Sequence, residues 1–82
     1  MTFQASSYIS HPVPDLSDAD FANADLSDAI LQNGILVGAD LSVADLSGAD
    51  LTNADLTEAD LTDADLTDAI LDGAKLEDAI MS

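Results

Sequence analysis

The chain has 82 residues, of which 48% are hydrophobic, and its one lysine against 17 acidic residues gives a formal net charge of −16. This length allows one small domain. The charge repels nucleic acid and anionic lipid surfaces, and it attracts cations or basic proteins. The absence of cysteine excludes disulfides and thiolate metal sites. We therefore expect a protein partner, still unidentified, and neither a nucleic-acid nor a membrane partner.

Residues 1–13 form an irregular N-terminal segment that lacks the pattern of the rest of the chain. The segment has no basic stretch followed by an apolar one, as a secretory signal would have, so we expect a cytoplasmic protein. Phe3, Tyr8 and Ile9 are candidate lid side chains over the first repeat, and Pro12 and Pro14 would stop further strand addition. A disordered tail is the alternative interpretation.

Residues 14–82 follow a period of five. Every fifth residue is large and apolar, and all leucines of the chain occupy this central position. Two positions before each centre the residue is small: Pro14, Gly34 and otherwise alanine. The central residues are Leu16, Phe21, Leu26, Leu31, Leu36, Leu41, Leu46, Leu51, Leu56, Leu61, Leu66, Leu71, Leu76 and Met81.

A period of five excludes both regular elements. In an α-helix the apolar position would rotate by about 140° per repeat and leave no apolar face. In a flat strand an odd period would send alternate leucines to opposite sides. A backbone that turns once per repeat places each leucine and the alanine before it on one inner side. The remaining positions are mostly Asp, Ser, Thr, Asn and Gly, which suit tight turns. The pattern therefore predicts a solenoid.

The tandem A(D/N)LXX units over residues 14–82 resemble those of the pentapeptide-repeat family. The resemblance implies an all-β fold, a right-handed quadrilateral parallel β-helix with four pentapeptides per coil. It further implies about three and a half coils for this chain, with interior columns formed by central residues twenty positions apart.

Isoleucines and one lysine replace the usual Asp before the centre in five units. With four units per coil, Ile30 and Ile70 share an outer column with Asp50 between them. Lys75 lies below Asp55 in another column. Ile35 and Val37 follow around the corner from Ile30. We expect Ile30, Ile35 and Val37 to form an apolar patch for a partner, although scattered surface apolar residues often have no role.

The repeat ends at Ile80 and Met81 without a polar capping element. We expect the last coil to form an end-to-end homodimer through an isologous contact. A fragment of a longer repeat tract, or an idealised sequence, is an alternative that also fits the regular register. The expected interface residues are thus Ile30, Ile35, Val37, Ile70, Ile80 and Met81.

Reaction chemistry is not indicated. His11 is the only histidine and lies in the irregular segment, and the recurring Ser and Thr have no adjacent base. The many acidic pairs lack an apolar pocket that would separate their pKa values. The Gly pairs of calcium-binding nonapeptide repeats are missing. We therefore expect no enzyme activity, no cofactor and no specific metal site, only diffuse cation screening.

The leading functional interpretation is a non-catalytic binding or scaffold module, because the outer surface of a solenoid is usually its working part. The alternative rests on resemblance: pentapeptide-repeat proteins linked to quinolone resistance imitate B-DNA and act on DNA gyrase. The negative charge favours this alternative, since a rod of about 17 Å would carry more charge per length than duplex DNA. The uninterrupted coils and the short rod argue against it.

Overall fold

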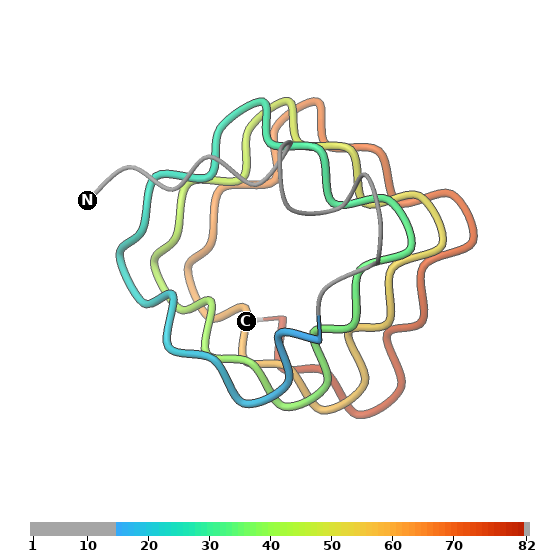
Figure 1. Ribbon diagram of the computed structural model, residues 1–82. Helices are drawn as coiled ribbons and strands as arrows, with labels where there is room; N and C mark the ends of the chain where they lie inside the picture. Colours follow the sequence, from blue (N-terminus) through green and yellow to red (C-terminus); the bar gives the residue numbers. More distant parts are fainter. Residues whose placement is uncertain (1–14, 82) are drawn as a thin grey trace.

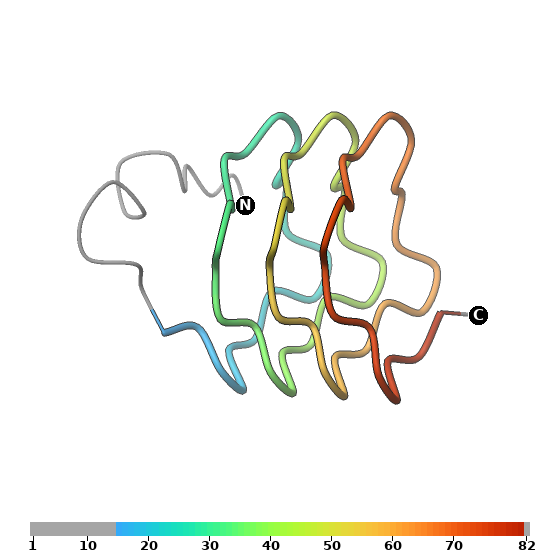
Figure 2. The same cartoon turned by 90° about the vertical axis from the view of Figure 1, so that its right-hand side faces the viewer.

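The computed structural model describes residues 15–81. The predicted irregular segment 1–13, with its candidate lid side chains, and Pro14 lie outside the described residues. Seen end-on, the described backbone runs as superimposed loops around one axis (Figure 1). Turned by a right angle, these loops are successive coils stacked side by side (Figure 2). The period of five thus produces the predicted solenoid.

Backbone bridges fix the register between coils. Each bridge is parallel and joins residues twenty positions apart, such as Asp20 with Asp40 and Asp40 with Asp60. Twenty residues are four pentapeptides, so each coil contains four units, and we number its four sides by their bridging residues. Side 1 contains Asp15, Ile35, Asp55 and Lys75; side 2 contains Asp20, Asp40, Asp60 and Ile80; side 3 contains Asp25, Asp45 and Asp65; side 4 contains Ile30, Asp50 and Ile70.

The β-structure of residues 15–81 consists of isolated single-residue bridges, without a helix or an extended strand. The cause is a turn in every unit. The N–H of the alanine three residues after each centre donates to the carbonyl of the central residue, as from Ala49 to Leu46 at 3.0 Å. The residue before that alanine has a positive φ, +71° at Gly48 and +61° at Asn33, as the third position of a type II turn requires. A chain that turns every five residues leaves no room for a longer strand.

Each of the four units between Asp40 and Ala59 satisfies all five of its backbone N–H groups. Three of them reach neighbouring coils, one closes the turn, and one donates to the aspartate that precedes the centre. In unit Asp45–Ala49 the donors and acceptors are Asp45 to Ala24 O, Leu46 to Asp65 O, Ser47 to Asp45 Oδ1, Gly48 to Thr67 O and Ala49 to Leu46 O. Because buried unpaired N–H groups are costly, this pattern explains why a backbone without long strands is stable.

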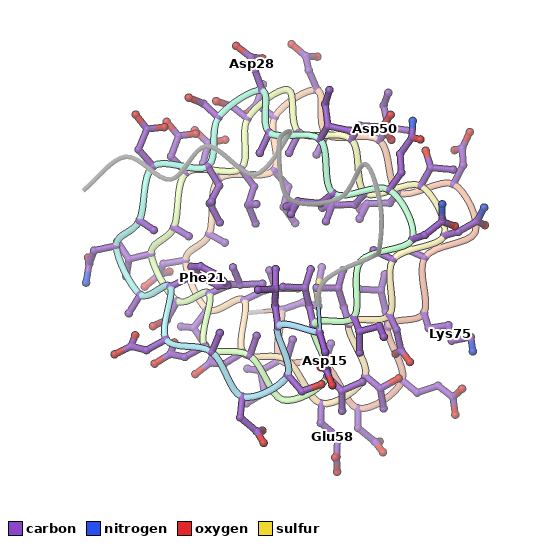
Figure 3. All side chains as sticks on the ribbon, viewed as in Figure 1. Asp15, Phe21, Asp28, Asp50, Glu58 and Lys75 are labelled. Carbon is purple, nitrogen blue, oxygen red and sulfur yellow. The ribbon has the colours of Figure 1, made fainter. Side chains whose placement is uncertain are left out.

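The core is formed by the central residues and the alanines two positions before them. Figure 3 shows Phe21 pointing to the inside of the coils, whereas Asp28, Asp50 and Glu58 point outward. No polar or charged side chain is buried among the described residues. Seven leucines are at most 1% exposed: Leu26, Leu31, Leu36, Leu41, Leu46, Leu51 and Leu56. The predicted division into an apolar inside and an acidic outside is therefore present.

Candidate interaction surfaces

Sides 2 and 3 carry columns of aspartates. The columns are Asp20, Asp40 and Asp60 on side 2, and Asp25, Asp45 and Asp65 on side 3. Neighbouring coils lie about 4.8 Å apart, the usual separation of bridged backbones. Like charges at that distance repel by roughly 1 kcal/mol in water. Consecutive units occupy sides 2 and 3, so the two columns form one acidic surface, interrupted by Val43 at the corner between the sides and by Ile80 on side 2.

Each aspartate that precedes a central residue has one carboxylate oxygen with a structural role in its own turn. Asp50 Oδ1 accepts the Thr52 backbone N–H at 3.1 Å and the Thr52 hydroxyl at 2.6 Å. The hydrogen bond from the Thr52 hydroxyl, with those from Gln32 and the Thr52 N–H, lowers the pKa of Asp50. The corresponding hydroxyl and N–H of the serine or threonine two residues on also lower the pKa of Asp15, Asp40, Asp55 and Asp65. These carboxylates are therefore held in their charged form.

Sides 4 and 1 differ, because the stretch of chain that passes from Ile30 on side 4 to Ile35 on side 1 carries no charge. No ionisable residue occurs between Asp28 and Asp40. Ile30 is 44% exposed, Ile35 is 37% exposed, and Val37 is partly exposed. We call the outward side chains of residues 29–39 the apolar window. Sequence reasoning identified its three apolar residues but missed its eleven-residue gap in charge, which is readable in the sequence.

Carboxylates border the apolar window on both neighbouring coils. Ile35 bridges Asp15 on one neighbouring coil and Asp55 on the other, while Ile30 bridges Asp50. Gln32 lies between them in sequence, and its Nε2 donates to Asp50 Oδ2 at 2.5 Å. The apolar window is thus an uncharged area with an acidic rim. The rim carboxylate of Asp50 accepts the hydrogen bond from Gln32 inside the window.

The other predicted interface residues lie elsewhere. As predicted, Asp50 separates Ile70 from Ile30, and Lys75 follows Asp55 in the side 1 column. Ile70 is 45% exposed, and Ile80 and Met81 are about equally exposed on the last described coil. Val43, which sequence reasoning did not select, is 53% exposed at the corner after side 2. The predicted set therefore divides into a window group and an end group.

The two ends of the described core differ in burial. Leu26 and Leu31 on the first coil are 1% exposed, whereas Leu66, Leu71 and Leu76 on the last coil are only partly buried. The N–H groups of these three leucines have no acceptor among residues 15–81, because the register places that acceptor nineteen positions further on. Among residues 15–81, the last coil thus has more accessible central leucines than the inner coils.

Cavities and metal clusters are not found in the described part of the chain. Residues 15–81 enclose no pocket, and they contain no group of three or more His, Asp or Glu side chains arranged to hold a metal ion. The same residues include no helix long and apolar enough to cross a membrane. His11 lies outside the described residues. The surfaces available for function are therefore the outer sides and the last coil.

The comparisons with known proteins agree with this geometry. The family model for pentapeptide repeats matches residues 14–42 and 44–82 in 8 copies, so the chain belongs to the pentapeptide-repeat family. Members of the family form right-handed quadrilateral β-helices, which establishes the fold class and confirms the resemblance seen in the A(D/N)LXX units.

Two crystal structures of cyanobacterial and plant proteins are similar to this chain. The pentapeptide-repeat protein Rfr23 of Cyanothece 51142 has 34% identity and a TM-score of 0.78, and the match covers 80% of this chain and 46% of that one. A pentapeptide-repeat protein from the thylakoid lumen of Arabidopsis thaliana has 38% identity and a TM-score of 0.78, over 79% and 45% of the two chains. The matched part of this chain thus covers less than half the length of either. A comparison with curated proteins gives no match.

Proposed function

We propose that this chain is a non-catalytic protein-binding module, with the apolar window as its contact for a partner. The observation that carries the proposal is the charge-free stretch of residues 29–39 within a chain of net charge −16, with Ile30 and Ile35 exposed at its surface. Apolar residues surrounded by a polar rim are typical of the energetic centre of a protein interface.

The rim specifies the chemistry of the partner. Asp15, Asp50 and Asp55 surround the window, and the pKa of each is lowered by hydrogen bonds within its own turn. A complementary surface has an apolar side chain that covers Ile30 and Ile35, with Lys or Arg around it to face these carboxylates. Because the rim is exposed, its contribution is to orientation and association rate more than to affinity.

A capture experiment tests the window. The immobilised chain is compared with the variant Ile30→Asp/Ile35→Asp and with Val43→Asn, which removes a more exposed apolar side chain elsewhere. Aspartate occupies the same position in most other units, so the double variant keeps the fold. We expect a basic protein that is retained by the wild type and by Val43→Asn, lost from the double variant, and released by salt. Identical capture by all three proteins would reject the proposal.

A second surface is the last described coil of the solenoid. We propose that this coil binds a second copy end to end through Ile80, Met81 and the partly buried leucines. Light scattering at tens of micromolar tests the contact: the wild type and Val43→Asn give a dimer mass, and Ile80→Asp gives a monomer mass. A monomeric wild type would reject the contact without affecting the window.

Imitation of DNA toward gyrase is the second candidate function. The acidic surface of sides 2 and 3 favours it, because its carboxylates repeat at a regular spacing. DNA, however, is negative on all sides, whereas Ile30, Ile35 and Ile70 interrupt sides 4 and 1. A supercoiling assay separates the candidates, since a protein that imitates DNA inhibits gyrase at micromolar concentration and a module that binds through the apolar window does not.

A further inference from the structure

Gly34 departs from the repeat in the middle of the apolar window. The residue two positions before the centre is alanine in every other described unit. Gly34 is buried, as are Ala39 and Ala54 at the same position of other units. Glycine in place of alanine gives the unfolded chain more freedom, so it lowers stability unless the backbone or the packing requires it.

The structure shows no such requirement at Gly34. Unlike the other three glycines of the chain, Gly34 has no positive φ. Its N–H donates to Leu31 O at 3.0 Å, and the Ala39 N–H donates to Leu36 O at the same distance. A Cβ built at Gly34 would lie 3.0 Å from Leu31 O and at least 3.8 Å from other atoms outside the adjacent residues. Because turns of the same geometry contain alanine throughout the solenoid, this turn accommodates it too.

The residue before Gly34 is an asparagine, and the two residues together have a reactivity of their own. In an Asn–Gly pair the glycine nitrogen can attack the asparagine Cγ, because glycine has no side chain to obstruct closure of a five-membered succinimide ring. Asn33 is exposed, so water reaches its side-chain amide. Glycine at this position therefore has a chemical consequence without a structural benefit.

Two other asparagines occupy the same turn position but are followed by alanine. The φ angle is 64° at Asn23, 61° at Asn33 and 60° at Asn53. The backbone N–H of each donates to a carbonyl of the next coil at 2.8 to 2.9 Å, and all three side chains are exposed. The three turns thus differ chiefly in the residue that follows asparagine.

We propose that Asn33–Gly34 is a site of spontaneous deamidation in the folded protein, which places a carboxylate inside the apolar window. The turn first opens at the hydrogen bond from Gly34 N–H to Leu31 O. The Gly34 nitrogen then loses its proton and bonds to Asn33 Cγ, and the side-chain amide nitrogen leaves as ammonia. One water molecule opens the ring at either carbonyl, which gives aspartate or isoaspartate at position 33.

The fold accepts aspartate at this position. The residue twenty positions on, Asn53, is uncharged, so the new carboxylate meets no like charge in the same column of the next coil. Isoaspartate instead adds a methylene group to the main chain, which strains the bonds from Asn33 N–H to Thr52 O and from Asp55 N–H to Gly34 O. Aspartate already has this turn position, with positive φ, in five units: Asp18, Asp28, Asp63, Asp68 and Asp78.

Either product ends the charge-free stretch between Asp28 and Asp40. The new charge lies two residues before Ile35, which is exposed in the window. Covering a carboxylate with an apolar side chain is costly. That this charge weakens a partner's apolar contact rests on the proposed function of the window, whereas the reaction itself does not.

Peptide mapping of the full chain tests the reaction. The folded protein is incubated at neutral pH and digested with an endoprotease that cleaves before Asp but not before isoaspartate. The three asparagines then lie in the peptides of residues 20–24, 28–39 and 50–54. Aspartate at position 33 appears as a new cleavage that divides the peptide of residues 28–39, and isoaspartate appears as the same peptide, uncleaved, with an increased mass.

The unreacted neighbours are the internal control. We expect Asn33 to convert about tenfold or more faster than Asn23 and Asn53 in the same folded molecules, because only its ring closure is unobstructed. A sample unfolded in urea gives the rate without the fold. Equal rates at the three asparagines, or no conversion of Asn33 in the folded protein while the unfolded sample converts fully, would overturn the inference.

The variant Gly34→Ala tests whether glycine has a packing role. We expect Gly34→Ala to slow conversion of Asn33 about tenfold, to the rate of Asn53, and to leave the urea midpoint unchanged or raise it. The matched exchange Ala39→Gly, in the next unit, should lower the midpoint. A lower midpoint for Gly34→Ala would show that packing requires the glycine and would overturn the inference. Each measurement uses the isolated chain, so its outcome is independent of any partner of the window.

Discussion

At the scale of single residues, the fold depends on a position with positive φ in every unit. Asn23, Asn33 and Asn53 occupy it with φ between 60° and 65°, and Gly38 and Gly48 with 71°. The sequence predicted turn residues at this position from their chemistry. The sequence did not reveal that the aspartate three positions earlier accepts the backbone N–H of the residue two positions after it. A surface carboxylate has several possible hydrogen-bonding partners.

Val43 is the exception at this position, and it leads to a stability prediction. Its φ is 60°, a conformation that costs an L-residue about 1–2 kcal/mol and is least suited to a β-branched side chain. Asparagine tolerates it better. We therefore expect Val43→Asn to raise the free energy of unfolding by about 1 kcal/mol, measured by urea unfolding.

The same exchange at Val37 is the control for Val43→Asn. Val37 is also accessible but is not among the residues with positive φ. Val37→Asn should therefore leave the free energy of unfolding unchanged or lower it. A gain of stability from both exchanges would show that removing surface valine, and not relief of the backbone, is the cause.

At the scale of the coil, the sequence predicted the composition of each side because the period of five assigns every residue to the inside or the outside. Four units per coil followed only from the family resemblance, since nothing in the sequence shows that Leu31 shares a side with Leu51 and not with Leu36. The twenty-residue bridges, such as Ile30 to Asp50, confirm that number. The isolated form of the bridges was not predicted, because it depends on how much of each unit the turn occupies.

Position along the solenoid should determine what a core leucine contributes. Leu46 is 0% exposed between two coils, and Leu46→Ala should cost about 3–5 kcal/mol, the range for a deletion in a packed core. Leu71 is partly buried on the last described coil, so Leu71→Ala should cost about half as much. Urea unfolding at low protein concentration measures both. Equal losses would mean that another molecule covers the last coil under these conditions.

At the scale of the whole molecule, the dominant property is a net charge of −16 on columns of aspartates. Two effects of charge act on the folded state in opposite directions. Repulsion along columns such as Asp20, Asp40 and Asp60 opposes folding and is weakened by salt. The hydrogen bonds that lower the pKa of Asp40 and Asp65 favour folding only while these groups are ionised.

The pH dependence follows from the sign of each effect. A carboxyl group whose folded pKa lies below its ordinary value of 3.8 stabilises the fold above that value, and its contribution is lost as the pH falls through the folded pKa. At low salt we therefore expect the melting temperature to fall as the pH drops below 3.8.

Added salt separates the two effects. At neutral pH the melting temperature should rise between low and near-molar sodium chloride, because screening weakens the repulsion between columns. In near-molar salt the fall below pH 3.8 should persist, because hydrogen bonds to Asp50 and Asp55 are local. A melting temperature that does not respond to salt would show that column repulsion contributes little to stability.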